Sequence, residues 1–235
     1  MTRHLVIFAR APQFGRVKRR LARDIGIAEA TRFYRATLRR QFGSLSRDPR
    51  WTVWLFVTPD NEIHHAAWRG GVPPRHVRPQ GHGDLGQRML VPFRTLPPGP
   101  VVLVGSDIPA MRPSHIARAF QQLGRHELVF GPASDGGFWL IGARRIRPMP
   151  HGLFAGVRWS TAHALADTHG NIPLPVSVGE ADTLDDIDTA DDLRRFLLGA
   201  RDSSRASSLV IGKDRATGVA RPQQRQEPKR TAPAA

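Results

Sequence analysis

The sequence contains no cysteine among its 235 residues. Disulfide bonds, thiolate metal sites and cysteine nucleophiles are therefore excluded. It also has no apolar run long enough to cross a membrane, and the apolar stretch after Met1 is too short for a signal peptide. We therefore expect a protein of the reducing cytoplasm that does not associate with a membrane.

Several signatures of common enzyme classes are missing as well. There is no Gly-x-Ser-x-Gly elbow and no His-Glu-x-x-His motif, so neither a serine hydrolase nor a zinc protease is indicated. The glycines and the Lys-Ser/Thr pair of a Walker A loop are absent, and so is a Gly-x-Gly-x-x-Gly fingerprint. Any nucleotide would have to be bound in another way.

Acidic residues are few, because 20 Asp and Glu stand against 35 Lys and Arg, for a formal net charge of +15. The excess is local: residues 1–50 hold 13 basic and 3 acidic side chains, residues 51–199 hold 14 of each, and residues 200–235 hold 8 and 3. A nucleic-acid-binding protein would show basic residues interleaved with exposed aromatics, and no such stripe is present. The cluster suits a small polyanion such as a nucleotide, or is simply an arginine-rich surface.

Composition also divides the chain into two parts. Hydrophobic residues make up 40% of the sequence, which is enough for a core. From residue 200 onward Ser, Arg, Gln, Pro, Lys and Ala dominate. We predict one domain over residues 1–199 and a basic, disordered tail without catalytic residues over 200–235.

The central motif is a strand that ends in an aspartate. Residues 101–104 are apolar and three of them are valine, which predicts a strand buried on both faces of a parallel sheet. Asp107 follows, and Pro109 stops the strand. Because open α/β sheets bind ligands at the carboxyl ends of their strands, Asp107 is a candidate ligand for a divalent cation or a hydroxyl. The alternative is that it caps a turn.

A second motif follows the first predicted strand, residues 4–9. The loop after it contains Pro12, Gly15, Arg16 and Lys18 and passes into a helix. Backbone N–H groups at a helix N-terminus favour an anion, and basic side chains add charge. This arrangement favours phosphate binding, although a solvated basic helix start is the alternative.

Two glycine-rich turns and an acidic segment complete the set. The first turn, residues 81–86, permits close approach to a ligand or is a plain turn with Asp84 as a helix cap. The second, Asp135-Gly136-Gly137, lies between two apolar strands and is a candidate hairpin that adjoins the strand of Asp107. Residues 180–192 hold seven carboxylates and no basic residue. Asp186 and Asp188 precede the final helix and repel one another unless a cation is present.

In this order, the motifs resemble the GT-A superfamily of nucleotide-diphospho-sugar transferases. More narrowly, they resemble a bacterial family often labelled glycosyltransferase that is associated with radical-SAM and selenium-domain proteins. The matching motifs, spread over residues 4–198, are Phe8-Ala9-Arg10-Ala11-Pro12, Gly15-Arg16-Val17-Lys18, Arg20-Leu21, Gly83-Asp84-Leu85-Gly86, Arg88-Met89, Gly105-Ser106-Asp107-Ile108-Pro109, Gly131-Pro132-Ala133, Asp135-Gly136-Gly137, the segment 154–159 and Asp186-Ile187-Asp188-Thr189. The chain departs from the family at Arg19, where threonine is usual, and at Ala190-Asp191, where Pro-Glu is usual.

The resemblance implies an α/β fold with a mostly parallel, twisted central sheet and helices on both faces. It also implies a transferase that uses Mg²⁺ or Mn²⁺ and a nucleotide-activated substrate, with glycosyl transfer from a nucleotide sugar to a small acceptor as the first expectation. The fold is also similar to guanylyltransferases and to CMP-Kdo synthetase, so nucleotidyl transfer is the alternative, followed by a nucleotide-binding protein without turnover. No specific nucleic acid is expected as a partner.

The same resemblance implies roles for individual residues. Asp107, Lys18 and Asp135 are the predicted catalytic residues, and Asp107 and Asp188 are the predicted metal ligands. Nucleotide or phosphate binding is predicted for Ala11, Pro12, Gly15, Arg16, Lys18, Arg20, Gly83, Asp84, Gly86, Arg88, Gly136 and Gly137.

Overall fold

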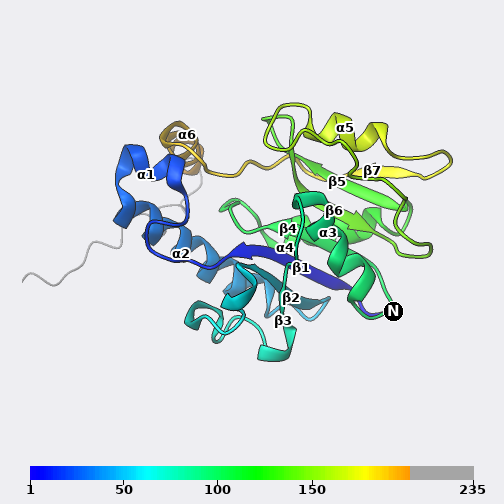
Figure 1. Ribbon diagram of the computed structural model, residues 1–235, viewed down its shortest axis with the longest axis horizontal. Coiled ribbons are helices and arrows are strands. Elements are labelled where there is room, and N and C mark those ends of the chain that lie inside the picture. Colours follow the sequence, from blue (N-terminus) through cyan, green and yellow to red (C-terminus); the bar gives the residue numbers. More distant parts are fainter. Residues whose placement is uncertain (202–235) are drawn as a thin grey trace, which may run out of the picture.

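The computed structural model describes residues 1–201. Its centre is a seven-stranded sheet in the order β3-β2-β1-β4-β6-β5-β7 (Figure 1). The strands are β1 (His4–Arg10), β2 (Thr52–Thr58), β3 (Val77–Pro79), β4 (Val101–Gly105), β5 (Leu128–Pro132), β6 (Phe138–Ala143) and β7 (Val178–Glu180). Only β6 runs antiparallel to its neighbours, so the sheet is mostly parallel, as predicted.

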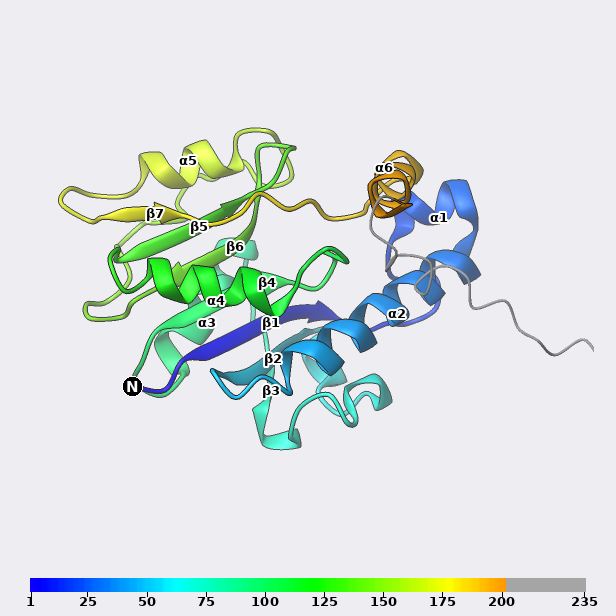
Figure 2. The same cartoon turned by 180° about the vertical axis from the view of Figure 1, so that it is seen from behind.

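Helices cover both faces of this sheet. They are α1 (Arg19–Ile25), α2 (Ile27–Leu45), α3 (Leu85–Thr95), α4 (Pro113–Gln122), α5 (Ala164–Gly170) and α6 (Ala190–Arg201), with short 3₁₀ turns at Asp60–Glu62, Ala66–Trp68 and Pro74–His76. One face packs against α2 and α4 and the other against α3 and α5 (Figures 1 and 2). None of the helices in the described residues combines the length and the apolarity that a bilayer crossing requires.

The apolar strands are explained by this two-sided cover. In β1, Leu5 and Ile7 belong to the core under α2 and α4, whereas Val6 belongs to the core under α3 and α5. β4 lies beside β1 in parallel register, with Leu103 opposite Val6, and is buried in the same way. Strands covered on both faces need apolar side chains at every position, which is why residues 101–104 show no alternation.

The strand order places β6 between β4 and β5. The turn 133–137 is thus the hairpin connection from β5 to β6, and β6 is the strand that adjoins β4. β6 enters the sheet with Phe138 at the edge where β4 ends. The turn therefore faces the same edge as Asp107.

The first helix and the last helix of the described chain meet beyond this edge. Leu21 of α1 and Ile187, which precedes α6, are buried in one small core with Ala30 and Phe33 of α2. Figures 1 and 2 show α1 and α6 side by side at one end of the molecule. The tail predicted for residues 200–235 starts inside α6, and the remainder lies outside the described residues.

Candidate active site

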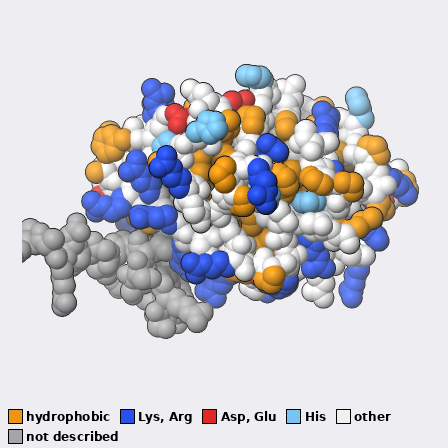
Figure 3. Space-filling model, turned by 90° about the horizontal axis from the view of Figure 1, so that it is seen from below, with side chains coloured by type: hydrophobic (Ala, Val, Ile, Leu, Met, Phe, Trp, Pro, Cys, Tyr) orange, Lys and Arg blue, Asp and Glu red, His pale blue; other side chains and the backbone are white. Residues whose placement is uncertain are grey.

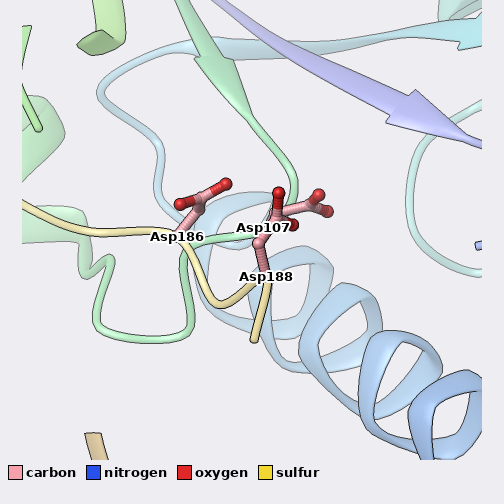
Figure 4. Close-up of side chains that lie close together, drawn as sticks. All are labelled: Asp107, Asp186 and Asp188. Atoms are coloured by element: carbon pink, nitrogen blue, oxygen red, sulfur yellow. The ribbon is translucent and has the colours of Figure 1, made fainter. Parts of the chain in front are cut away.

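Three carboxylates meet at the carboxyl edge of the sheet. Asp107 follows β4 directly, and Asp186 and Asp188 lie on the extended segment between β7 and α6. One oxygen of each lies within 4.8 Å of the other two (Figure 4). The backbone N–H of Ile187 donates to the carbonyl of Asp107 at 3.3 Å, which fixes the acidic segment against the end of β4. The structure thus brings together the two predicted metal ligands and adds Asp186 to them.

Lys18 lies among these carboxylates. Its Nζ is 2.8 Å from Asp107 Oδ2 and 2.9 Å from Asp188 Oδ1, and its side chain is 2% exposed. Burial disfavours the ammonium charge, but the carboxylates of Asp107 and Asp188 outweigh that effect and raise the pKa of Lys18 above its ordinary value. The residue has the left-handed backbone, with φ 47° and ψ 47°, at the start of α1. Lys18 was predicted to contact phosphate, and here its ion pairs hold two of the acidic side chains together.

Among the three carboxyl groups, Asp186 has a clearly raised pKa. Burial raises its pKa to about 6, and the neighbouring carboxylates, Asp188 first among them, add to the rise against the opposing effect of Lys18. A hard divalent cation prefers oxygen ligands and reduces the repulsion between carboxylates that lie this close together. The donor set of Asp107, Asp186 and Asp188 therefore fits Mg²⁺ or Mn²⁺.

A buried hydrogen-bond chain orients Asp107 from behind. The hydroxyl of Tyr34, on α2, donates to the carbonyl of Arg10 at 2.9 Å and accepts from the N–H of the same residue at 3.0 Å. It also lies 3.0 Å from Ser106 Oγ, which in turn donates to Asp107 Oδ1 at 3.2 Å. The ends of β1 and β4 are thus joined through one phenol. Tyr34 was not among the predicted site residues, and the contacts of its hydroxyl come from the structure alone.

A cleft of about 620 Å³ opens over the carboxylates. Of the predicted site residues, those that line it are Arg16, Lys18, Arg20, Arg88, Asp107, Asp135, Gly137 and Asp188. Lys and Arg side chains are spread over the face shown in Figure 3, with a dense group at the end where α1 lies in Figure 1. The predicted basic cluster thus borders the acidic one.

Other predicted nucleotide-binding residues do not line the cleft and have local structural roles. Ala11 is buried, and the Pro12 carbonyl accepts two bonds from Arg35. Asp84 caps α3 by accepting from the N–H of Gln87. Gly15 and Gly83 supply turns with φ of 73° and 96°.

Gly86 and Gly136 allow two close approaches. A Cβ on Gly86 would lie 2.4 Å from the Cβ of Phe154, and one on Gly136 would lie 2.2 Å from the carbonyl oxygen of Ala162. Both glycines therefore seat the segment 152–164 against the rest of the site. They were predicted to bind nucleotide, and the structure shows them packing against protein.

The cleft also contains residues that were not predicted. Arg10 and Arg19 line it, as do the aromatic residues Phe138 and Trp159. Gln80 is buried, donates to the carbonyls of Ala9 and Phe56, and accepts from Arg88 Nη1 at 2.8 Å. It holds Arg88 in the cleft, although Gln80 itself was given no role beside the glycine-rich turn that follows it.

Comparison with known proteins identifies the family of this chain. Residues 39–161 match the model of the family DUF2064, described as "Uncharacterized protein conserved in bacteria". The chain belongs to this family. The matched part of this DUF2064 protein includes Asp107 and the Asp135 turn, whereas Lys18 and the acidic segment lie outside it. No curated protein matches the sequence significantly.

Solved structures resemble this DUF2064 protein along most of its length. A Desulfovibrio desulfuricans G20 protein, provisionally assigned as a nucleotide-diphospho-sugar transferase, is 28% identical with a TM-score of 0.80, and the match covers 89% of this chain and 93% of that one. The 4-diphosphocytidyl-2C-methyl-D-erythritol synthase of Anaerococcus prevotii DSM 20548 is 10% identical with a TM-score of 0.56, covering 85% and 96%. A CMP:2-keto-3-deoxy-manno-octonic acid synthetase bound to CTP is 13% identical with a TM-score of 0.51, covering 86% and 100%.

The two less similar structures show the fold alone. Together with the Desulfovibrio protein they confirm the predicted α/β fold of the GT-A type.

Proposed function

We propose that this protein is a cation-dependent transferase that moves a glycosyl group from a nucleotide sugar to a small acceptor. The observation that carries the proposal is the meeting of Asp107, Asp186 and Asp188 in a cleft that is also lined by Arg16 and Arg20. A cation held by carboxylates next to basic side chains suits a diphosphate, because the cation and the basic side chains both neutralise its negative charge. The likeness to the Desulfovibrio protein points in the same direction.

Asp107, Asp186 and Asp188 would hold Mg²⁺ or Mn²⁺. When bound, the cation would neutralise the diphosphate and stabilise the charge that develops on the leaving nucleotide. Lys18 has three N–H donors, of which two are directed at Asp107 and Asp188. The third is available to a phosphate oxygen, so the predicted phosphate contact and the observed ion pairs are compatible.

The remaining predicted residues divide between binding and proton transfer. Arg20 Nη1 lies 3.8 Å from Asp188 Oδ2 on a largely exposed side chain, and with Arg16 it would bind the outer oxygens of the diphosphate. Asp135 lines the cleft beside the carboxylates, with Oδ1 accepting from the N–H of Gly137 at 2.9 Å. This bond orients Asp135 as the candidate acceptor of the proton that the attacking hydroxyl loses.

Thermal unfolding with a ligand panel tests the proposal. The panel consists of nucleoside di- and triphosphates and nucleotide sugars, each with and without Mg²⁺ or Mn²⁺. A ligand present at about 100 times its dissociation constant stabilises the fold by about 2.7 kcal/mol. We expect a stabilisation that requires nucleotide and cation together, and hydrolysis of the best nucleotide sugar to a nucleoside diphosphate. No stabilisation by any nucleotide with either cation would rule the proposal out.

Nucleotidyl transfer is the second candidate. It is favoured by the number of basic residues on the first loop and helix that line the cleft, namely Arg16, Lys18, Arg19 and Arg20, since a triphosphate carries more charge than a diphosphate. The two reactions give different products: nucleotidyl transfer releases pyrophosphate from a nucleoside triphosphate. Nucleotide binding with neither product would mark a binding protein without turnover.

A further inference from the structure

Part of the cleft lining is not explained by the ionic residues. It is apolar and comprises Phe8, Met89, Leu103, Phe138, Ile141 and Trp159, a group that we call the apolar slot. Phe8, Phe138 and Trp159 are partly exposed, whereas the other three are buried. Leu103 and Ile141 are register partners on β4 and β6 and form part of the sheet face under α3 and α5. Ligand pockets of this size are mostly apolar with a few placed polar groups. Here the apolar residues belong to or pack against the core under α3 and α5, whereas the carboxylates follow the ends of β4 and β7.

Trp159 lines this slot, and its indole ring is fixed by packing against two aromatic rings. Its ring centroid lies 6.2 Å from that of Phe138 and 5.7 Å from that of Phe154, with the planes at 63° and 55°. Gly86 allows this packing, because a Cβ there would lie 3.0 Å from Trp159 Cζ2. The indole is thus held in place before any ligand arrives.

The other tryptophans show that Trp159 is different. The remaining four are 3–8% exposed, and each indole N–H donates to a protein partner. Trp159 is only half-buried, and among the described residues no hydrogen bond of its N–H is formed. Ser160 follows it with φ 60°, a left-handed conformation that is unfavourable for serine and that is concentrated at functional sites. Ser160 and Thr161 line the cleft as well.

We propose that the apolar slot binds the acceptor, and that the acceptor carries its reactive hydroxyl on or next to an apolar ring. This inference rests on the proposed function. The diphosphate and the cation belong at the carboxylates and basic side chains, so the slot is left for the other substrate. Leu103 and Asp107 are four residues apart, at most about 14 Å of extended chain, which is the span of a small molecule. An acceptor whose ring lies against Leu103 is therefore short enough to present its hydroxyl near Asp107.

Saturation-transfer NMR with the full chain tests the slot. The probes are cyclohexanol and methyl glucoside, which offer a six-membered ring without and with polar groups. We expect cyclohexanol to bind in preference. Trp159→Ala should weaken it about tenfold, because the ring loses the apolar surface against which it is buried. Trp159→Phe should retain most of the binding, and thermal unfolding checks that both variants fold.

A matched control uses a second cavity of about 340 Å³, lined among others by Ile146, whose side chain is 56% exposed. Ile146→Ser should leave cyclohexanol binding unchanged. If cyclohexanol binding is lost in this variant but not in Trp159→Ala, the probe binds in the second cavity and the proposal is overturned. Equal binding of methyl glucoside would overturn the choice of an apolar ring.

The same experiment with UDP or CTP and Mg²⁺ separates acceptor from nucleobase. Simultaneous binding of nucleotide and cyclohexanol supports an acceptor slot, whereas displacement of cyclohexanol by either nucleotide would identify a nucleobase pocket instead. If no nucleotide of the thermal panel binds with either cation, the proposed function fails and the acceptor assignment fails with it. In that case the effect of Trp159→Ala still reports whether the slot binds apolar rings.

Discussion

The parallel half of the sheet and the half around β6 contribute to the candidate site in different ways. In the parallel half, β1 and β4 end at the same edge, so the first loop and Asp107 come together through topology alone. In the other half β6 runs in the opposite direction. The first residue of β6, Phe138, and the turn before it therefore lie at the site. The segment 152–164 is then added by close packing. The first loop and Asp107 are thus positioned by strand direction, whereas the segment 152–164 is positioned by side-chain fit.

The largest effect is expected in the parallel half, from Asp107→Asn. The variant removes a proposed cation ligand and one of the two ion-pair partners of Lys18. We expect cation affinity to fall by more than about 100-fold, since even residues that only orient metal ligands contribute 10- to 100-fold. The measurement is the cation-dependent shift in thermal unfolding with nucleotide. Asp182 lies on the acidic segment 180–192 and forms an exposed ion pair with Arg118 of α4. Asp182→Asn should therefore keep that shift. A normal shift in Asp107→Asn would show that strand topology does not specify the site.

Gly136→Ala tests the half that depends on side-chain fit. The new Cβ would lie 2.2 Å from the carbonyl oxygen of Ala162, at a residue with φ 82°. We expect a loss of roughly 3 kcal/mol in the free energy of unfolding, measured with urea, from the clash and the left-handed backbone together. Gly156→Ala is the matched control, because its φ is 66° and nothing lies within 4 Å of the new Cβ. That variant should lose about 1 kcal/mol. Equal losses would mean that the close approach to Ala162 contributes nothing.

Tyr34→Phe tests the link between β1 and β4 within the parallel half. The variant leaves the backbone groups of Arg10 and the hydroxyl of Ser106 without their buried partner. We expect unfolding to become easier by about 1–3 kcal/mol, and cation affinity to fall by about tenfold because Asp107 is less well oriented. Thr37→Val, which removes a buried hydroxyl from the same helix without touching Ser106, is the control. If both variants bind the cation equally well, the phenol has no positioning role.

The smallest expected effect is a pH dependence of stability in the parallel half. Burial lowers the pKa of His4 and of His76 below the ordinary histidine value of 6.5. Between the folded and the unfolded pKa, the unfolded chain binds more protons, so these groups contribute stability above pH 6.5 that is lost as the pH falls. Urea unfolding at pH 7.5 and 5.5 measures the loss. His76→Gln should reduce the difference between the two pH values, and an unchanged difference would exclude this histidine as a source.

Strand direction and edge position were predictable because they depend on runs of residues. The run 101–104 and the proline after it predicted a buried strand that ends beside a ligand site, and β4 is that strand. The basic first loop and the acidic segment were predictable for the same reason, since each is a short stretch rich in charges of one sign. That they face one another depends on chain direction in a parallel sheet.

Contacts between single side chains were not predictable. Glycine in a turn permits a ligand or a protein atom equally well, and in Gly86 and Gly136 the neighbour is protein. The partners of Lys18 are far away in the sequence, so nothing nearby revealed that the ammonium binds carboxylates. Trp159 occurs in a segment without periodicity, and only its packing between two aromatic rings gives it a place in the cleft.

The ion pair between Lys18 and Asp188 also has a consequence for the time at which the site forms. The two residues are separated by 170 positions, which a ribosome takes roughly 10 to 35 seconds to translate. During that interval the N-terminal lysine has emerged without its second carboxylate, and the small core around Leu21 lacks Ile187. Nearly the whole folded region must therefore be synthesised before Lys18 can pair with Asp188.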